Sequence, residues 1–211
     1  MKKTFEHLSS ERKEEIINAC ILEFGLHGYE KTTTDSIIQR IGISKGGLYE
    51  YISSKRELFV YVVTYTYTKL YDYLQRRIRK RDTALPKDLL DRVHLVSSYA
   101  IDFYIEHPGF VSLIVRTYQI ADDDLAKELE AVFKNRYLDI FGDASEVNLR
   151  FGRDKIIDML MWLLLKTRYE FLREMKSGKG ISEIRKDYME NWDFYISIMR
   201  SGVYRRVRRE A

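Results

Sequence analysis

Side chains able to donate hydrogen bonds to a polar or anionic partner recur at short intervals between residues 33 and 55. They are two threonines, a serine, two lysines and two tyrosines: Thr33, Thr34, Ser44, Lys45, Tyr49, Tyr51 and Lys55. Hydroxyl and ammonium groups contact phosphate oxygens, and some reach base edges when a helix carries them into a DNA groove. These residue types therefore favour recognition by hydrogen bonding.

The other residues that could carry chemistry form no catalytic or metal-binding pattern. The four histidines, His7, His27, His94 and His107, lack the spacing of a metal-ligand set. The single cysteine, Cys20, is not part of a nucleophile motif, and its apolar neighbours favour a buried core residue over the alternative of a reactive thiol. We therefore expect no enzymatic activity, no cofactor and no metal site.

Two short predicted helices, separated by a glycine, position the polar residues. The first begins at a threonine cap and carries an apolar stripe: Ile37, Ile38 and Ile41. Gly42 can adopt the left-handed conformation that ends this helix, and Ser44 offers the cap of the next one. Leu48 and Ile52 lie four residues apart and face the core. Residues 33–52 therefore predict a helix-turn-helix whose second helix is a reading helix.

The composition favours an almost wholly helical protein. The 211 residues include only two prolines and eleven glycines, and 45% are hydrophobic and 32% charged, as in an ordinary globular protein. We expect helices at about 10–24, 33–41, 45–52, 54–81, 86–106, 110–118, 122–141, 151–175 and 181–199. The fold class is all-α. We expect a three-helix DNA-binding domain at 1–56 and a helical domain for ligand binding and dimerisation at 57–211.

The last two predicted helices favour a homodimer. The segment 159–165 is apolar on all sides, so it must be covered on more than one face, and the final helix carries large aromatics at helical spacing. The predicted interface residues are Ile157, Leu160, Leu164, Tyr188, Trp192, Tyr195 and Met199. A purely intramolecular core is the alternative.

Bulk charge and hydropathy add little. Thirty-six basic residues against 32 acidic ones give a net charge of +4, so placement of the cations matters more than their number. Basic clusters at 76–81 and 205–209 favour solvated helix ends over accessory nucleic-acid contacts. The apolar run 159–165 is far shorter than the roughly 18 residues of a membrane span, so a cytoplasmic protein is expected.

The N-terminal quarter of the chain, residues 10 to 60, resembles the DNA-binding domain of the TetR family of bacterial transcriptional regulators. The most specific segments are Gly42-Ile43-Ser44-Lys45-Gly46-Gly47-Leu48-Tyr49 and Lys55-Arg56-Glu57-Leu58. The rest of the chain resembles the family only in its organisation. The resemblance therefore implies a regulator that binds DNA as a dimer, but it names no ligand.

The resemblance also implies roles for individual residues. Lys45 and Tyr49 would touch bases or nearby phosphates, with Gly46 and Gly47 letting the helix approach the groove floor. Phosphate contacts are implied for Thr33, Thr34, Tyr51 and Lys55, and Ser44 completes the predicted DNA-binding set. Each has a structural alternative, since a threonine can simply cap a helix, a tyrosine can pack, and a lysine can be solvated.

Three residues depart from the family pattern. Glu50 puts a carboxylate on the reading helix, where it accepts from a cytosine amino group or points away from DNA. Gly47 replaces a common Thr or Ser, and the Gly46-Gly47 pair costs the helix on the order of 1 kcal/mol per glycine relative to alanine. Ile52 replaces an aromatic residue.

We expect a repressor that a small molecule releases from a palindromic double-stranded operator. The effector is expected to be largely hydrophobic, with a pocket lined by Phe103, Tyr104, Phe110, Tyr118, Trp162 and Tyr169. Core packing is the alternative for these aromatics, and Arg116, Lys166 and Arg168 are either surface or interface charges or partners of an anionic effector. The alternative function is a helical protein-protein interaction module that has lost operator binding and uses the basic tail, residues 200–209.

Overall fold

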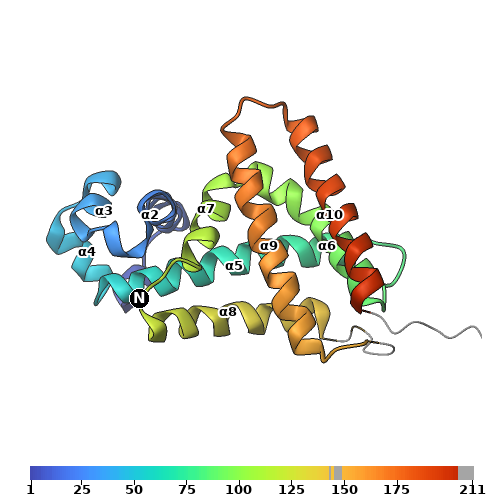
Figure 1. Cartoon of the computed structure of the whole chain (residues 1–211). Coiled ribbons are helices and arrows are strands. Elements are labelled where there is room, and N and C mark those ends of the chain that lie inside the picture. The colour runs from blue at the N-terminus through green and yellow to red at the C-terminus, as the bar shows by residue number, and fades with distance from the viewer. Residues whose placement is uncertain (143, 145–148, 204–211) are drawn as a thin grey trace, which may run out of the picture. The chain divides into compact units, whose positions relative to one another are not determined.

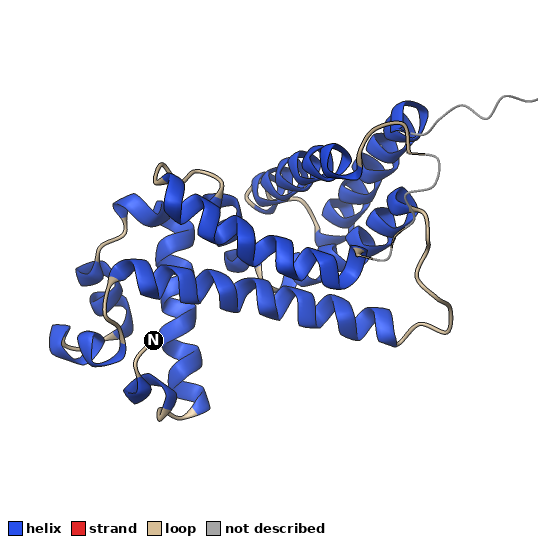
Figure 2. Cartoon of the chain, turned by 90° about the horizontal axis from the view of Figure 1, so that it is seen from below, coloured by secondary structure: helices blue, strands red, loops and turns tan. Residues whose placement is uncertain are grey.

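The structure, a computed structural model, describes residues 1–142, 144 and 149–203, with only the backbone of residues 135 and 137–139. These residues form helices and no β-strand, which confirms the all-α prediction (Figures 1 and 2). The helices are α1 (Lys3–Glu6), α2 (Ser10–Lys31), α3 (Thr34–Ile41), α4 (Lys45–Tyr51), α5 (Lys55–Arg79), α6 (Leu89–Glu106), α7 (Pro108–Thr117), α8 (Asp123–Phe141), α9 (Arg153–Met175) and α10 (Ile181–Val203).

The chain divides into two compact units. Unit 1 comprises residues 1–72 and 107–136, and unit 2 comprises residues 73–106 and 137–211. Helices α5 and α8 contribute to both units. The division between a DNA-binding domain at 1–56 and a ligand-binding domain at 57–211 is a functional one, and it stays a prediction.

Helix α2 is longer than expected. It begins at the Ser9 cap, whose side chain accepts a hydrogen bond from Arg12 N, and it continues through Gly25, where a helix end was expected. The break comes at Gly28, whose φ of 77° lies in the left-handed region that glycine adopts without strain. Gly25 instead serves packing, because a Cβ there would lie 3.3 Å from the main chain of α7 at Gly109 and Leu113.

The helix-turn-helix has the predicted construction. Thr33 caps α3, Gly42 ends it in the left-handed conformation with φ of 72°, and Ser44 caps α4. Leu48 and Ile52 are fully buried, as their spacing predicted. The apolar back of α4 therefore fixes which of its faces points outward.

The core of unit 1 joins α2, α5 and α7. Phe24 meets Phe59 edge to face with ring centres 4.8 Å apart, and Cys20 is fully buried beside them in α2. The prediction of a buried cysteine is confirmed.

Unit 2 is built on α6, α9 and α10. Helix α10 packs against both α6 and α9. Trp192 of α10, Tyr104 of α6 and Phe171 of α9 are among the buried side chains of unit 2. Helix α6 begins three residues later than expected, after Asp88, because that carboxylate accepts from Asp91 N at 2.9 Å and caps the helix. Pro86 lies before the helix, where its carbonyl accepts from the buried Arg92.

Among the described residues, no helix combines the length and the apolar character that a membrane span requires.

Candidate nucleic-acid interface

The reading helix α4 presents a polar front to solvent. Lys45 is 67% exposed, Tyr49 is 39% exposed, and Gly46 and Glu50 are also exposed. The Lys45 ammonium lies 3.4 Å from the Asp35 carboxylate of α3, in an exposed ion pair that contributes little and that a phosphate can replace. This front face is free of main-chain obstruction at Gly46, and it can therefore approach the floor of a groove.

The two caps leave hydroxyl hydrogens available. Thr33 Oγ1 accepts from Ser36 N at 3.0 Å, and Ser36 Oγ accepts in turn from Thr33 N, so both form a capping box. Ser44 Oγ accepts from Gly47 N at 3.1 Å. Because each cap uses only the oxygen as acceptor, Thr33 and Ser44 can cap a helix and also donate to phosphate.

Gly47 fits the Ser44 cap closely. A Cβ at position 47 would lie 3.3 Å from Ser44 Oγ, which is tighter than ordinary contact. The departure from the family pattern at this position therefore allows a compact first turn.

Tyr51 and Lys55 have protein partners of their own. Tyr51 is half-buried, and its ring meets that of Phe5 edge to face at 6.1 Å. Lys55 Nζ donates to the carbonyls of Tyr29 at 2.9 Å and Thr32 at 3.0 Å, and it lies 4.4 Å above the Tyr29 ring. Lys55 thus satisfies the carbonyls at the end of α2, a task that the sequence did not reveal.

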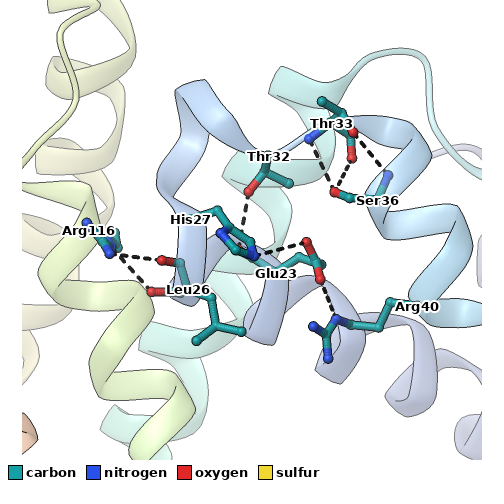
Figure 3. Close-up of polar contacts among 9 residues, drawn as sticks. Glu23, Leu26, His27, Thr32, Thr33, Ser36, Arg40 and Arg116 are labelled. Carbon is teal, nitrogen blue, oxygen red and sulfur yellow. Dashed lines mark hydrogen bonds and ion pairs between the residues drawn. The ribbon is translucent and has the colours of Figure 1, made fainter.

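A buried carboxylate holds α2 to α3. Glu23 is almost fully buried in α2, and its Oε1 accepts from Arg40 Nε of α3 at 2.5 Å (Figure 3). His27 Nε2 lies 3.9 Å from the other carboxylate oxygen, and Thr32 Oγ1 donates to the Glu23 carbonyl at 3.2 Å. The sequence reasoning missed this cluster, although a charged residue within the apolar stripe of α2 was a signal for it.

Helix α7 caps the broken end of α2. The Gly28 break leaves carbonyls of α2 without helical partners. Arg116 donates to the Gly25 carbonyl at 3.3 Å and to the Leu26 carbonyl at 2.9 Å (Figure 3). Ser112 Oγ donates to the Gly25 carbonyl at 2.8 Å. Arg116, predicted to be a surface or interface charge or a partner of an anionic effector, makes these contacts within unit 1.

The predicted interface residues lie at different depths in unit 2. Leu160, Tyr188, Trp192 and Met199 are buried by the chain itself, which favours the intramolecular alternative for these four. Ile157, Leu164 and Tyr195 are half-buried. The periodicity correctly identified a buried stripe, but the chain's own helices cover it. The exposed apolar residues lie on other faces of α9 and α10: Met159, Trp162, Tyr169, Phe194 and Ile198.

The predicted pocket residues belong to both units. Phe103 and Tyr104 are buried in unit 2, whereas Trp162 is 74% exposed and Tyr169 is 59% exposed. Phe110 and Tyr118 belong to unit 1. Trp162 and Tyr169 therefore do not line an enclosed site within unit 2, because both side chains project outward from α9.

Two polar groups predicted to meet a partner or solvent are buried in unit 2: Arg168, predicted as a surface or interface charge or an effector partner, and Tyr188, predicted at the dimer interface. Arg168 is buried, and its Nε donates to Tyr104 OH at 2.9 Å, so it is not the surface charge considered for it. Tyr188 is buried nearby, and burial raises the pKa of its phenol. In the described part of the chain, no three His, Cys, Asp or Glu side chains are grouped as a metal site.

Comparison with known sequences identifies the N-terminal segment. Residues 16–62 match the family model described as bacterial regulatory proteins, tetR family. This match contains α3, α4 and the start of α5, which carry the whole predicted DNA-binding set. It agrees with a DNA-binding regulator rather than an enzyme.

Curated relatives share a low level of identity with the chain. The nucleoid occlusion factor SlmA of Glaesserella parasuis serovar 5 (strain SH0165) is 23% identical over 186 residues, which are 86% of this chain and 89% of the relative. The factor of the same name from Vibrio vulnificus (strain YJ016) is 28% identical over 107 residues, about half of each chain at 50% and 52%.

Solved structures share the fold along most of the chain. A TetR family transcriptional regulator from Chloroflexus aurantiacus J-10-fl superposes with a TM-score of 0.66 at 17% identity, covering 97% of this chain and 99% of that one. The transcriptional regulator FadR from Bacillus subtilis, solved in complex with stearoyl-CoA, gives 0.65 at 13% identity, covering 85% and 96%. At these identities the likeness concerns the fold.

Proposed function

We propose that this chain, a DNA-binding regulator of the TetR family, represses transcription by binding a palindromic operator as a homodimer and is released by a small-molecule effector. The observation that carries the proposal is the two-sided construction of α4: Leu48 is buried, whereas Lys45, Gly46 and Tyr49 face solvent. Its site of action would be the cytoplasm, where the operator lies.

The exposed front of α4 supplies the sequence reading. Lys45 and Tyr49 donate hydrogen bonds to base edges or adjacent phosphates, while Gly46 and Gly47 allow close approach. Phosphate contacts come from Thr33, Thr34, Ser44, Tyr51 and Lys55, which flank this front on α3, α4 and α5. For Lys55, one ammonium with three hydrogens serves two carbonyls and has one donor left for a phosphate.

Dimerisation is assigned to the exposed apolar residues of unit 2. Three of them follow one side of α9 at intervals of three and seven residues, and two lie four apart on α10: Met159, Trp162, Tyr169, Phe194 and Ile198. Large exposed aromatics of this kind are enriched at interfaces between proteins. A symmetric pair would present two reading helices about 34 to 36 Å apart, one turn of DNA.

The effector is expected to bind the helices between 57 and 211 and to be largely hydrophobic. The buried aromatic groups Phe103 and Tyr104 support such a site, as does the fold-level likeness to FadR, whose structure contains stearoyl-CoA. Release requires that the effector bind the DNA-incompatible spacing of the dimer more tightly than the compatible one.

The route of coupling within unit 1 runs through α7. Helix α6 ends at Glu106 and α7 begins at Pro108, so only His107 separates the two helices in the chain. Because Ser112 and Arg116 of α7 hold the carbonyl end of α2, a displacement of α7 would alter the support of α3 and α4.

Nucleoid occlusion is a second candidate function. It rests on the relative from Glaesserella parasuis, which aligns with 86% of this chain. Mapping of the occupied chromosomal sites separates the two functions: binding confined to a few promoters supports the repressor, and binding dispersed over the chromosome independently of promoters supports nucleoid occlusion.

The proposal is tested by gel shift with DNA selected by the protein and with scrambled DNA of equal length. We expect the double variant Lys45→Ala/Tyr49→Ala to lose the preference for selected DNA while keeping its helical circular dichroism. The matched control, Lys186→Ala, removes an exposed lysine of α10 and should bind as the wild type does. Retention of the preference in the double variant would contradict the proposal.

A further inference from the structure

The reading helix is too short and too rich in glycine to be stable alone. It has seven residues, two of them glycines, and isolated helices shorter than about 12 residues are marginal in water. Its N-terminus is capped by Ser44, but its last turn, Leu48 to Tyr51, contains no lysine or arginine to favour the negative end of the helix dipole. Stability at the C-terminal end must therefore come from elsewhere in the chain.

The N-terminal segment, residues 1–6, supplies the missing donors. Lys2 Nζ donates to the Tyr49 carbonyl at 2.7 Å, Thr4 Oγ1 donates to the Glu50 carbonyl, and Lys2 N donates to the Tyr51 carbonyl at 2.8 Å. The Leu48 carbonyl accepts from Ile52 N at 3.2 Å. All four carbonyls at this end of α4 are therefore satisfied, three of them by the segment.

Apolar packing and a hydrogen bond hold the segment in place. Phe5 of α1 is fully buried, with its ring edge to face against those of Tyr51 at 6.1 Å and Tyr61 at 5.6 Å. Lys13 Nζ of α2 donates to the Glu6 carbonyl at 2.6 Å. The segment thus ties the end of the reading helix to α2 and α5.

We propose that the N-terminal segment is the C-terminal cap of the reading helix, and that Lys2 and Thr4 are positioning residues for DNA recognition that act through the main-chain oxygens of Tyr49 and Glu50. This inference rests on the proposed function of α4 as the reading helix. The Lys2 ammonium donates to one main-chain oxygen here, that of Tyr49, and the neighbouring Lys3 has no such contact among those found for the described residues.

Two measurements on Lys2→Ala/Thr4→Ala test the proposal, with Lys3→Ala as a control of equal charge from the same segment. Removal of two of the three donors should quicken amide exchange in α4 by about tenfold, while α2 and α5 exchange as in the wild type. Affinity for selected operator DNA should fall at every salt concentration with an unchanged slope of log affinity against log salt. Lys3→Ala should leave the exchange of α4 amides unchanged.

The outcomes are distinct. An unchanged rate of exchange in α4 would overturn the cap, whatever the DNA result. A slope reduced by about one would make Lys2 a phosphate contact and overturn its positioning role. If the wild type bound no duplex, the proposed function would fail, but faster exchange in the double variant would still support the cap. If the double variant failed to fold, the single variant Thr4→Ser would be measured instead. It keeps the hydroxyl donor, so the amides of α4 should exchange as in the wild type, and faster exchange would contradict the assignment.

Discussion

Arg116 of α7 donates a 2.9 Å hydrogen bond to the main-chain oxygen of Leu26, directly before the break that ends the regular part of α2. A charged donor on a carbonyl is stronger than a neutral one, and this one joins two helices 90 residues apart in sequence. We expect Arg116→Met, which keeps much of the side-chain volume, to lower operator affinity about fivefold, the lower end of allosteric coupling energies. Binding isotherms on operator DNA measure it. Arg76→Met, at an exposed arginine in the last turn of α5, is the control, and equal affinities of the two variants would exclude this link.

Gly25 is predicted to be intolerant of a methyl group. Alanine normally stabilises a helix by up to about 1 kcal/mol relative to glycine, but a Cβ here would press on the main chain of α7 at 3.3 Å. Gly25→Ala should therefore lower the free energy of unfolding by about 1 to 2 kcal/mol, as overpacking does. Urea unfolding measures the change. Gly46→Ala, where a Cβ meets only Ser44 Oγ at 4.0 Å, should not destabilise the protein. A stabilised Gly25→Ala protein would contradict the close packing of α2 on α7.

Lys55 is predicted to have two separable effects. Lys55→Ala should lower the log-log salt slope of DNA binding by about one unit, because one phosphate contact is lost. It should also lower the melting temperature, since the carbonyls of Tyr29 and Thr32 lose their donor. Titrations at several salt concentrations, together with thermal unfolding, separate the effects. A lower melting temperature with an unchanged slope would remove Lys55 from the DNA interface.

Trp162 tests the revised dimer face. Its side chain is 74% exposed in the single chain, so Trp162→Asp should not disturb the core of unit 2. Burial of this residue against a second copy would place the carboxylate in an apolar environment at a cost of several kcal/mol. We expect sedimentation to show that the variant is a monomer. Its binding to operator DNA should be weaker and less cooperative than that of the wild type. A variant that sediments as the wild type does would exclude this face as the interface.

Cys20 should be unreactive while the chain is folded. Burial raises the pKa of its thiol to about 12, with a smaller contribution from the nearby Glu23 carboxylate. The unfolded thiol ionises near pH 8.5, so the free energy of unfolding contains a term that falls as pH rises from about 8.5 towards 12. Iodoacetamide at pH 8 should label Cys20 only in denaturant, and rapid labelling of the folded protein would show that α2 opens locally.

The sequence predicted the helix-turn-helix well because its signals are local. Gly42, Ser44 and the pair Leu48 and Ile52 each determine a cap or a face within four residues, and the structure has all of them as predicted. The all-α fold followed for the same reason.

What the sequence did not reveal depends on partners distant in the chain. The stripe through Tyr188 and Trp192 identified a buried face, but periodicity cannot tell a face covered by α6 and α9 from one covered by a second chain. A helix end was expected at Gly25 because glycine commonly ends helices. Its packing role was hidden because its close neighbours on α7 lie more than 80 residues away in the sequence. Lys2 and Thr4 reach carbonyls more than 45 residues ahead, and no local pattern announces such contacts.

Selection of bound duplexes from a random DNA pool tests the reading role of α4 most directly. The wild type should enrich a palindrome whose half-site centres lie about one helical turn apart, and Lys45→Ala/Tyr49→Ala should lose enrichment at the positions in each half-site that α4 contacts. Enrichment of no sequence by the wild type, or of the same palindrome by the variant, would contradict the assignment of α4 as the reading helix.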